Sequence, residues 1–342
     1  PPVKGQAFRQ SPHLEKVLIT QVQSLIDQGV VEKCNSPWCA QAFMVPKPTP
    51  GEYRLVVDYR NLNRATKADA YPLPQIDTTL ESLVGKKNFT SIDLQSGFWQ
   101  VEMDENSSEK TAFRTPLGTY RWKVMPFGLI NAPSTFQRLM NNVLEGLPHT
   151  QCYIDDTITG SETFDDHLRH LDEVFDRLEG ARLTISGHKC DWMTEEVEYL
   201  GFIVSGDGIR ACEKKLKPIL DFPTPKSRKG VQRFMGAVNY YKSFVKDLGS
   251  IATPLFKLTP KKAKFNWTDK EQGAFDEIKR MLTNPPVLAQ PNFSLPFLLY
   301  TDASDCGLGA VLAQVQEDVE RVIKYNSRTL KSAELNYSTY HR

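Results

Sequence analysis

The sequence predicts an α+β protein with more than one domain, in which strands pair mainly antiparallel. The chain has 342 residues, which is too long for one small hydrophobic core. Hydrophobic residues make up 40% of the chain and charged residues 24%, as in ordinary globular proteins. Short β-prone runs and segments of helical period follow each other in a mixed order, and this order favours an antiparallel layer over a parallel sheet.

The first half of the chain begins with a helix and continues mainly with strands. Apolar residues recur at helical spacing over residues 12–28, with Ser11 as the expected cap and Gly29 as the stop. A short helix is expected at residues 76–83, and the composition of residues 48–51 predicts a hairpin turn. The strands expected in this half are residues 41–46, 52–58, 88–93, 97–102 and 119–124.

The second half alternates helices with strand-like runs. Pro133 lies in the first turn of a predicted helix, a position that suits its fixed φ. Pro285-Pro286 and Pro291 mark a boundary before a second, strand-rich domain. The expected helices are residues 131–144, 163–180, 229–245 and 268–283. The expected strands are residues 151–154, 157–159, 182–186, 197–204, 297–302, 309–315 and 321–327.

Charge is unevenly distributed along the chain. The formal net charge is only +1, but residues 210–264 hold 14 Lys/Arg against three Asp/Glu. Such a basic block predicts a face that binds a polyanion, with a solvated helical surface as the alternative. The aromatic residues interleaved in the block favour nucleic acid as the polyanion. These aromatics are Phe234, Tyr240, Tyr241 and Phe244.

Several classes of protein are disfavoured by what the sequence lacks. It has no run of about 18 apolar residues, so no membrane span is expected. The start Pro1-Pro2-Val3-Lys4 carries no apolar signal segment and no Met, which indicates a fragment or a piece of a polyprotein. The six cysteines form no Cys-x-x-Cys pair and have no accompanying His cluster, so we expect reduced cytosolic thiols rather than a zinc site.

Two adjacent acids, Asp155 and Asp156, are the most informative residues. They lie between two β-prone runs, which predicts a tight hairpin with the acids at its tip. Neighbouring carboxylates repel each other, so they are kept at low cost only in solvent or against a cation. Asp93, at the end of the run 88–93, is a third candidate. Three carboxylates from two strands can hold two Mg²⁺ ions, as in-line phosphoryl transfer requires. Taken alone, Asp155-Asp156 is equally compatible with a solvated turn.

A series of motifs resembles the reverse transcriptases of gypsy-type LTR retrotransposons, which are relatives of retroviral reverse transcriptases. The motifs are Val57-Asp58-Tyr59-Arg60-Asn61-Leu62-Asn63, Tyr71-Pro72-Leu73-Pro74, Ser91-Ile92-Asp93-Leu94-Gln95-Ser96-Gly97-Phe98, Met125-Pro126-Phe127-Gly128-Leu129, Asn131-Ala132-Pro133, Tyr153-Ile154-Asp155-Asp156, Tyr199-Leu200-Gly201 and Tyr300-Thr301-Asp302-Ala303-Ser304. One such motif is a weak signal, but the set stands in the family's order over roughly residues 36–340.

The resemblance implies a right-hand polymerase with fingers, a palm with an antiparallel sheet, and a thumb. A connection and a truncated ribonuclease H-like α/β domain would follow. The expected parts are an N-terminal segment with the fingers and part of the palm (1–88), the palm with a fingers segment (89–210), the thumb (211–250), the connection (251–294) and the truncated domain (295–342).

The resemblance also implies an activity, which is RNA- and DNA-templated extension of a primer 3′-hydroxyl with deoxynucleoside triphosphates. By resemblance, Asp93 and Asp155 bridge two Mg²⁺ ions, and the backbone carbonyl of Leu94 is a further ligand. Asp156 is the supporting acid. The donors are all oxygen atoms, which suits Mg²⁺ and allows Mn²⁺ as a substitute.

Nucleotide contacts are expected from the fingers and the palm. Lys47 and Arg54 flank the turn at 48–51 and would clamp the triphosphate, with two exposed surface charges as the alternative. By resemblance, Phe98 lies beneath the incoming sugar and collides with a 2′-hydroxyl, or else it is a core aromatic. Gly128 would let the backbone approach the nucleotide, and Phe127 would pack against the base or template.

Primer and template contacts are expected further along the chain. Leu200-Gly201 matches the family's primer grip. Four residues lie near one face of a predicted thumb helix that would track the shape of the duplex. They are Gln232, Gly236, Asn239 and Tyr240. Lys189 falls where the family has a lysine proposed to protonate pyrophosphate, with an ordinary surface lysine as the alternative.

Asp302 resembles the first carboxylate of a ribonuclease H site. The next acid of that site would follow Tyr337-Ser338-Thr339, about where this chain ends. We therefore expect no RNA cleavage by this chain alone.

The expected partners are an RNA template, a DNA primer, the RNA–DNA hybrid and deoxynucleoside triphosphates, in the cytoplasm within virus-like particles. Some relatives are dimers in which one subunit only supports the other, so a homodimer stays open. The alternative function is therefore a catalytically silent subunit that binds nucleic acid. The presence of Asp93, Asp155 and Asp156 favours the enzyme, and a ribonuclease is a third, weaker hypothesis.

Overall fold

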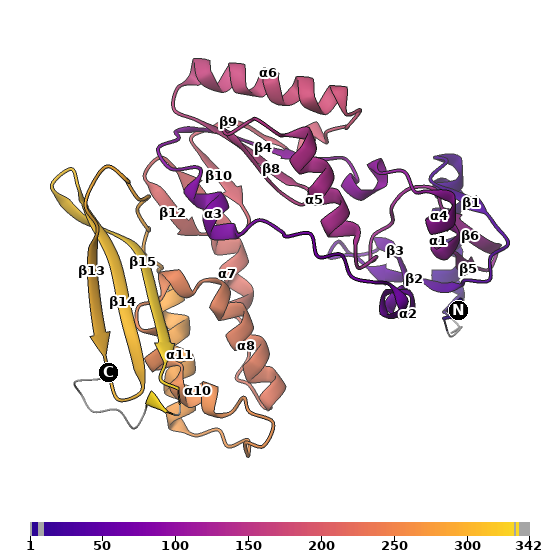
Figure 1. Cartoon of the computed structure of the whole chain (residues 1–342). Coiled ribbons are helices and arrows are strands. Elements are labelled where there is room, and N and C mark those ends of the chain that lie inside the picture. The colour runs from indigo at the N-terminus through magenta and orange to yellow at the C-terminus, as the bar shows by residue number, and fades with distance from the viewer. Residues whose placement is uncertain (1, 6–9, 332, 335–342) are drawn as a thin grey trace. The chain divides into compact units, whose positions relative to one another are not determined.

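The computed structural model describes residues 2–5, 10–331 and 333–334, and its elements confirm the α+β class (Figure 1). Contacts divide the chain into two compact units. Unit 1 comprises residues 1–75, 92–159 and 168–190, and unit 2 comprises residues 76–91, 160–167 and 191–342. This division does not test the domain boundaries expected above, which stay predictions.

A five-stranded sheet in unit 1 has the order β1-β6-β5-β2-β3. Its strands are β1 (Val31–Lys33), β2 (Ala40–Pro46), β3 (Tyr53–Val57), β5 (Phe113–Thr115) and β6 (Gly118–Trp122). The β2–β3 hairpin is antiparallel, as predicted, whereas β2 pairs with β5 in parallel. The predicted first helix is α1 (Pro12–Asp27), and the Ser11 side chain caps it by accepting from the Leu14 N–H. Leu18, Val22 and Leu25 of α1 pack into the sheet's core with Phe113 and Trp122.

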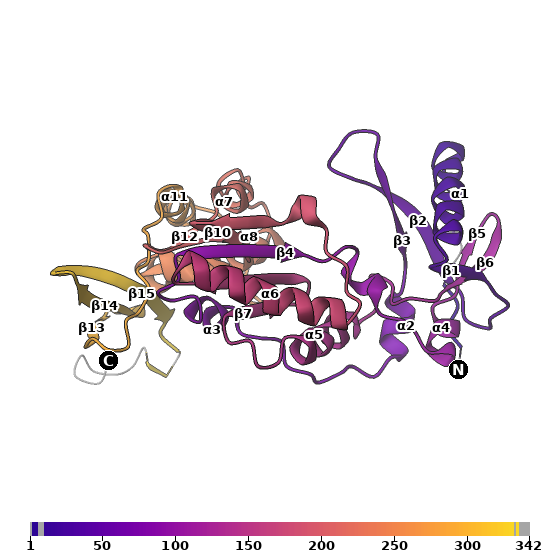
Figure 2. The same cartoon turned by 90° about the horizontal axis from the view of Figure 1, so that it is seen from above.

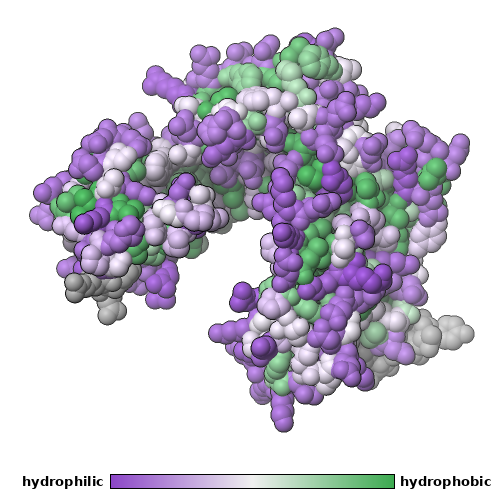
Figure 3. Space-filling model, turned by 180° about the vertical axis from the view of Figure 1, so that it is seen from behind, coloured by the Kyte–Doolittle hydropathy of each residue, from purple (hydrophilic) through white to green (hydrophobic). Residues whose placement is uncertain are grey.

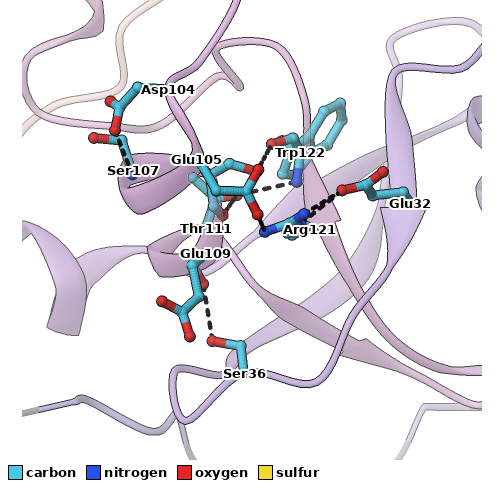
Figure 4. A network of polar contacts seen from close by, with 10 residues as sticks. Glu32, Ser36, Asp104, Glu105, Ser107, Glu109, Thr111, Arg121 and Trp122 are labelled. Carbon is cyan, nitrogen blue, oxygen red and sulfur yellow. Dashed lines mark hydrogen bonds and ion pairs between the residues drawn. The ribbon is translucent and has the colours of Figure 1, made fainter.

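Arg121 of β6 ties this sheet to the short helix α4 (Glu105–Lys110) (Figure 4). Its guanidinium donates to Glu32 at 2.7 Å and to Glu105 at 2.5 Å. Hydrogen bonds to these two carboxylates, Glu105 first, raise the pKa of Arg121. The buried Thr111 hydroxyl accepts from the Trp122 N–H at 3.0 Å, so the end of α4 is fixed to the same strand.

The carboxylate-bearing strands belong to a second sheet, with the order β7-β8-β4-β9. Its strands are β4 (Asn88–Asp93), β7 (Thr150–Tyr153), β8 (Asp156–Ser161) and β9 (Asp191–Thr194). Two predicted helices, α5 (Ala132–Val143) and α6 (Phe164–Gly180), are confirmed, and Figures 1 and 2 show α6 running alongside this sheet. Phe136 and Met140 of α5 and Val174 of α6 form one core with Ile92 and Cys152 of the strands.

Residues 97–102 are not the predicted strand. They begin with a 3-10 turn, η1 (Gly97–Gln100), after Ser96 at φ 53°. In this turn Phe98 and Trp99 both pack on Phe127, and each has a further aromatic partner of its own. The Phe98 ring lies 5.5 Å from that of Phe136, and the Trp99 ring lies 5.5 Å from that of Trp122. A tight turn points consecutive side chains in directions that satisfy both contacts.

Two further strand predictions are wrong in detail. Residues 182–186 form only an isolated bridge, Leu94 with Ile185, because Arg182 at φ 57° turns the chain after α6. Residues 197–204 are two strands, β10 (Glu196–Tyr199) and β11 (Phe202–Ser205). They are separated by Leu200 and Gly201, which both have positive φ. Several elements were not predicted, among them β1, β5, β9, α4, α2 (Arg60–Ala65) and η2 (Gly187–Lys189). A hairpin turn at residues 205–208 was predicted, and β11 pairs there with β12 (Gly208–Ala211).

Unit 2 continues with helices and an antiparallel sheet of order β10-β11-β12. The helices of unit 2 are α3 (Ile76–Glu81), α7 (Glu213–Leu220), α8 (Arg228–Tyr240), α9 (Leu248–Ile251), α10 (Thr253–Lys257) and α11 (Asp269–Thr283), with the 3-10 turn η3 (Lys242–Phe244) after α8. Helix α11 starts with a capping box between Thr268 and Glu271. Phe234 of α8 packs on Phe275 of α11, with ring centroids 4.6 Å apart.

The last sheet confirms the three strands predicted near the C-terminus. It has the order β13-β14-β15 and is antiparallel throughout, with strands β13 (Leu298–Ala303), β14 (Gly307–Gln316) and β15 (Val319–Thr329). Tyr337-Ser338-Thr339 lies outside the described residues.

The surface has the mixed composition expected from the sequence. On the face shown in Figure 3, apolar residues are interspersed among hydrophilic ones. Within the described residues, none of the helices has the length and apolar character needed to cross a membrane. All six cysteines are free thiols.

We predict that Gly208→Ala destabilises the protein while Gly273→Ala stabilises it. Gly208 has φ 149°, and a Cβ there would overlap the carbonyl oxygen of Leu288, which also accepts from the Ile209 N–H at 2.8 Å. Gly208→Ala should lower the free energy of unfolding by about 2 kcal/mol or more. Gly273 lies exposed in α11 with open space around it, so alanine should add about 0.5–1 kcal/mol. Urea unfolding measures both, and an unchanged midpoint for Gly208→Ala would contradict the first expectation.

Candidate active site

The β7–β8 hairpin presents two carboxylates at its tip, as predicted. Tyr153 pairs with Asp156, so Ile154 and Asp155 form a two-residue turn. Asp155 and Asp156 are both exposed. Ile154 has φ 60°, which is an unfavourable conformation for a β-branched residue. The turn therefore stores backbone strain directly beside the first of the two acids.

Asp93 lies at the same edge of the sheet. The Lys87 N–H, just before β4, donates to the Ser161 carbonyl at the end of β8 at 2.8 Å. At the other end Gly97, which follows β4, lies beside Asp155, which precedes β8, because a Cβ on Gly97 would be 3.5 Å from the Asp155 Cβ. The neighbouring strands β4 and β8 therefore run antiparallel, and if the register of Lys87 and Ser161 continues along the pair, Asp93 lies opposite Asp155.

The surroundings of Asp93 leave one carboxylate oxygen without a hydrogen bond. Its Oδ1 is buried and has no hydrogen-bond partner among the described residues. The nearest cation is the Lys189 ammonium, with Nζ at 3.5 Å from Oδ1. The Asp93 backbone is held on both sides, since its N–H points at the Cys190 sulfur at 3.4 Å and its carbonyl accepts from Ser186 at 2.8 Å. A buried, unsatisfied carboxylate oxygen suits a bound cation.

The donors at this edge fit a hard divalent cation, although they do not form a closed cage. Leu94 forms an isolated β-bridge with Ile185. The hydrogen bonds of this bridge run from the Gln95 N–H to the Thr184 carbonyl and from the Ser186 N–H to the Asp93 carbonyl. Residues 184–186 therefore leave the Leu94 carbonyl unused. In the described part of the chain, no three His, Cys, Asp or Glu side chains gather closely enough to hold a metal ion. Ions such as Mg²⁺ commonly use one or two protein carboxylates together with water and substrate phosphates, so an open edge is sufficient.

An aromatic group lies next to this edge. Phe98 is half-buried, and its ring centroid is 5.1 Å from that of Phe127 and 5.5 Å from that of Phe136. Phe127 is 53% exposed, so it can meet a ligand. Gly128 has φ 94°, which favours glycine, and its carbonyl accepts from the Asn63 side chain at 2.9 Å.

Lys47 and Arg54 lie at one end of the β2–β3 hairpin. Arg54 pairs with Val45, and the Lys47 N–H bonds to the carbonyl of Glu52, so both cationic side chains point to the same face. Lys47 also pairs with Glu52 at 3.0 Å. Both residues are exposed, so this ion pair contributes little and a triphosphate could replace it.

The predicted primer-grip residues form the β10–β11 turn, and two tyrosines hold it. Leu200 has φ 48° and Gly201 has φ 79°. The Tyr240 hydroxyl donates to the Leu200 carbonyl at 2.5 Å, and the Tyr241 hydroxyl donates to the Gly201 carbonyl at 3.3 Å. Burial raises the pKa of Tyr241 to about 12, so this hydroxyl keeps its proton at neutral pH. Phe202 stacks on Tyr240 with ring centroids 5.4 Å apart.

The predicted nucleic-acid face of α8 is exposed, and the opposite face of this helix forms the core. Gln232, Gly236, Asn239 and Tyr240 are exposed, whereas Val231, Phe234, Met235 and Val238 are buried. Gly236 has open space where a Cβ would lie. The Gln232 amide is already engaged, because it donates to the Thr259 carbonyl at 3.1 Å.

Asp302 lies exposed on β13, opposite Gly309 of β14. It lines a surface pocket together with Gly309, Asn326 and Arg328. The Asp247 carboxylate reaches the same place, because a Cβ on Gly309 would collide with its Oδ1.

Two residues that support the candidate site were not identified from the sequence. Gln137 of α5 is fully buried and accepts a hydrogen bond from the Ile154 N–H at 2.7 Å. Tyr241 binds the primer-grip turn, although only its neighbour Tyr240 was predicted to contribute. A signal for Gln137 was present in the sequence, because it is a polar residue within the apolar stripe of Ala132, Phe136 and Met140.

Comparisons with known proteins identify the family and the fold. The family model described as reverse transcriptase (RNA-dependent DNA polymerase) matches residues 45–204. A second model, the RNase H-like domain found in reverse transcriptase, matches residues 267–342. The Drosophila melanogaster Pol polyprotein from transposon 297 is 41% identical over 325 residues, which cover 93% of this chain and 30% of the relative. The Pol polyprotein from Drosophila transposon opus is 38% identical over 355 residues, covering 99% of this chain and 35% of the relative.

The similarity extends to yeast elements and to solved structures. A Schizosaccharomyces pombe Tf2-3 polyprotein is 34% identical and covers 93% of this chain and 24% of its own length. The chain thus spans about a third or less of the curated relatives' length. The foamy viral protease-reverse transcriptase in complex with double-stranded DNA matches with a TM-score of 0.88 and 26% identity, over 100% of this chain and 60% of that one. The same viral protein in complex with an RNA/DNA hybrid matches with a TM-score of 0.83 and 25% identity, over 99% and 46%.

We predict that the Cys152 thiol, at the base of the strained turn, resists alkylation in the native protein. Burial, with a smaller effect from the Asp155 and Asp156 charges, raises its pKa to about 12. Only about one thiol in 10⁴ is then ionised at pH 8, so iodoacetamide should spare Cys152 and label the half-buried Cys306. Mass spectrometry of peptides, with urea-unfolded protein as the control, measures both. Equal labelling of the two native thiols would contradict this expectation.

Proposed function

The chain belongs to the reverse transcriptases of gypsy-type LTR retrotransposons, and we propose that it copies RNA and DNA templates by extending a primer 3′-hydroxyl with deoxynucleoside triphosphates. The observation that carries this proposal is the edge of the sheet at which β4 ends with Asp93 and the Asp155-Asp156 turn leads into β8. Phosphoryl transfer asks little covalent chemistry of a protein, which must mainly hold the reactants in line and stabilise charge. The right-hand polymerase fold with an RNase H-like domain agrees with the similarity to foamy viral enzymes.

The proposed partners follow from the relatives. Two solved relatives are complexes with double-stranded DNA and with an RNA/DNA hybrid. We propose the same classes of duplex for this chain, together with deoxynucleoside triphosphates. The exposed amides of Gln232 and Asn239 on α8 support contacts that follow duplex shape, and the basic block at 210–264, which includes the exposed Lys229 and Arg233 of this helix, supports a strong dependence on salt. The proposed setting is a cytoplasmic virus-like particle, and a homodimer stays open.

Reverse transcriptases use divalent metal ions, and we propose two Mg²⁺ ions for this site. Asp93 and Asp155 would hold them, with the Leu94 carbonyl as a further ligand and Asp156 in support. Such ions lower the pKa of the primer hydroxyl and neutralise charge on the departing pyrophosphate. Lys189, which lies 3.5 Å from Asp93 Oδ1, balances the charge of the acid and is placed to meet a phosphate oxygen.

The other site residues bind and orient the substrates. Lys47 and Arg54, on one face of their hairpin, bind the triphosphate. Phe98 is held between Phe127 and Phe136, so its ring cannot easily move away from an added 2′-hydroxyl. Gly128, which lacks a side chain and has positive φ, lets the backbone approach the nucleotide.

The Leu200-Gly201 turn is proposed to hold the primer end. Its two carbonyls already accept hydrogen bonds from Tyr240 and Tyr241, so the turn is rigid before nucleic acid arrives. Rigidity of this kind places the 3′-hydroxyl at the cost of little ordering entropy.

A catalytically silent supporting subunit is the second candidate. The ion pair between Lys189 and Asp93 favours it, because a cation already compensates one of the acids. Primer extension separates the two functions.

The polymerase assignment predicts that Asp155→Asn loses primer extension on RNA and DNA templates. Removal of a metal ligand should lower kcat by at least about 100-fold, since even supporting residues of metal sites contribute 10–100-fold. Affinity for the primer–template, measured by gel shift, should stay nearly unchanged. The matched control is Asp302→Asn, an exposed aspartate on β13, which should extend primers normally. A wild-type chain that binds duplex but extends no primer, with Mg²⁺ or Mn²⁺, would instead be the silent subunit.

If Phe98 excludes ribonucleotides by colliding with their 2′-hydroxyl, Phe98→Val should admit them. The smaller side chain removes the collision with the 2′-hydroxyl. The ratio of kcat/KM for a deoxynucleotide to that for the matching ribonucleotide should therefore fall by at least about tenfold. Phe136→Leu, which alters the same aromatic group from the core side, is the control and should change the ratio less. If the Phe98→Val ratio equals that of the wild type in single-nucleotide incorporation, Phe98 is a core residue and not a gate.

A further inference from the structure

The strained residue Ile154 has both of its backbone polar groups bound by side chains. Its N–H donates to the Gln137 Oε1 at 2.7 Å. Its carbonyl accepts from the Cys152 thiol at 3.1 Å. Two-residue hairpin turns normally use Gly, Asn or Asp where φ is positive, so an isoleucine at φ 60° needs such support from its surroundings.

Gln137 is built into the fold to give this support. It is fully buried although its side chain is polar. Its amide nitrogen donates to the Cys152 carbonyl at 3.0 Å and to the Asn141 Oδ1 at 2.8 Å. Both N–H donors of the amide and one acceptor position of its oxygen are therefore used, and only the orientation with oxygen toward Ile154 satisfies these three partners. A buried amide that makes bonds through both its nitrogen and its oxygen holds its partners in one arrangement.

Asp155 follows directly on the residue that Gln137 holds, and Gly97 lies beside it, since a Cβ at Gly97 would be 3.5 Å from the Asp155 Cβ. If the Ile154 backbone relaxed toward negative φ, the following peptide would rotate. The Asp155 carboxylate would then leave the edge that it shares with Asp93.

We propose that Gln137 is a positioning residue for the polymerase reaction, which acts by holding Ile154 in its strained conformation so that Asp155 faces Asp93. The inference rests on the function proposed above. Gln137 touches neither substrate nor reacting atoms, so its effect should appear in the rate of the chemical step and not in substrate binding.

The test uses the whole chain in single-nucleotide incorporation on a primer–template. Gln137→Met keeps the length of the side chain and removes its hydrogen bonds. It should lower kcat by about 10–100-fold, the range found for residues that orient metal ligands. The KM for the nucleotide and the dissociation constant for the primer–template should change by less than about threefold. A kcat within about threefold of the wild type would overturn the proposal.

A second arm tests whether the effect passes through Ile154. Glycine adopts positive φ without strain, so in an Ile154→Gly background the hydrogen bond from Gln137 matters less. Gln137→Met should then lower kcat by a clearly smaller factor than in the wild type. A loss of the same size in both backgrounds would show that Gln137 acts by another route.

The matched control is Gln314→Met in β14. Gln314 is likewise fully buried, accepts from a backbone N–H (Asn292, 2.8 Å) and donates to two carbonyls (Asn292, 2.8 Å, and Leu295, 3.1 Å). It should lower the midpoint of thermal unfolding to a similar extent while leaving kcat unchanged. An equal loss of kcat in Gln314→Met would mean that the effect is general destabilisation.

Two outcomes keep the proposal testable if Gln137→Met does not fold. Gln137→Glu keeps the acceptor for the Ile154 N–H and loses the donors, so its kcat should stay within about threefold of the wild type. Adding Cys152→Ala removes the thiol that donates to the Ile154 carbonyl and should then lower kcat further. A loss of kcat of about tenfold or more in a folded Gln137→Glu would refute the role of the bond to Ile154. No extension by the wild type, in contrast, would refute the proposed function itself.

Discussion

The pairing of β8 with β4 is the constraint on which the site depends. Neither strand alone can bring carboxylates from residue 93 and residue 155 to one place. Antiparallel pairing places the start of β8 beside the end of β4, since Lys87, just before β4, bonds to Ser161 at the end of β8. The cost of holding like charges together is met by exposure of Asp155 and Asp156 and by Lys189 near Asp93.

Strain and its compensation recur at the places where this protein is proposed to handle its substrates. Ile154, Leu200 and Ser96 all have positive φ although none is glycine. Ile154 is held by Gln137, and Leu200 is held by the Tyr240 hydroxyl. In both cases a side chain from a helix supplies the hydrogen bond. Because the helix is itself fixed by packing, this bond holds the backbone of the turn in one conformation.

The similarity to transposon polyproteins explains why the family could be identified at modest sequence identity. Motifs such as Tyr153–Asp156 and Met125–Leu129 are short segments in strands and turns, whose geometry fixes the spacing of their residues. The core needs only apolar residues of suitable volume, so it can change while the fold is kept. A TM-score of 0.88 at 26% identity reflects this difference.

Much of the site could be predicted from the sequence, because its acids are adjacent to clear β-prone runs and stand in a recognisable order. The α+β class, the hairpin bearing Asp155-Asp156, helices α1, α5, α6 and α11, and the last three strands were all predicted correctly. Local period and turn composition are sufficient for such elements, since they depend on neighbours within a few residues.

Only the tertiary structure decided how the strained turns are held and where local patterns give way. Residues 97–100 form a 3-10 turn in which Phe98 and Trp99 both pack on Phe127, while Phe98 also packs on Phe136 and Trp99 on Trp122. Gln137 contacts Ile154, 17 residues away, and Tyr240 contacts Leu200, 40 residues away. Contacts over such separations depend on how helices pack on sheets, and no period or motif in a single sequence records that packing. The sequence alone thus determined which functional side chains are present, and tertiary packing determined their geometry.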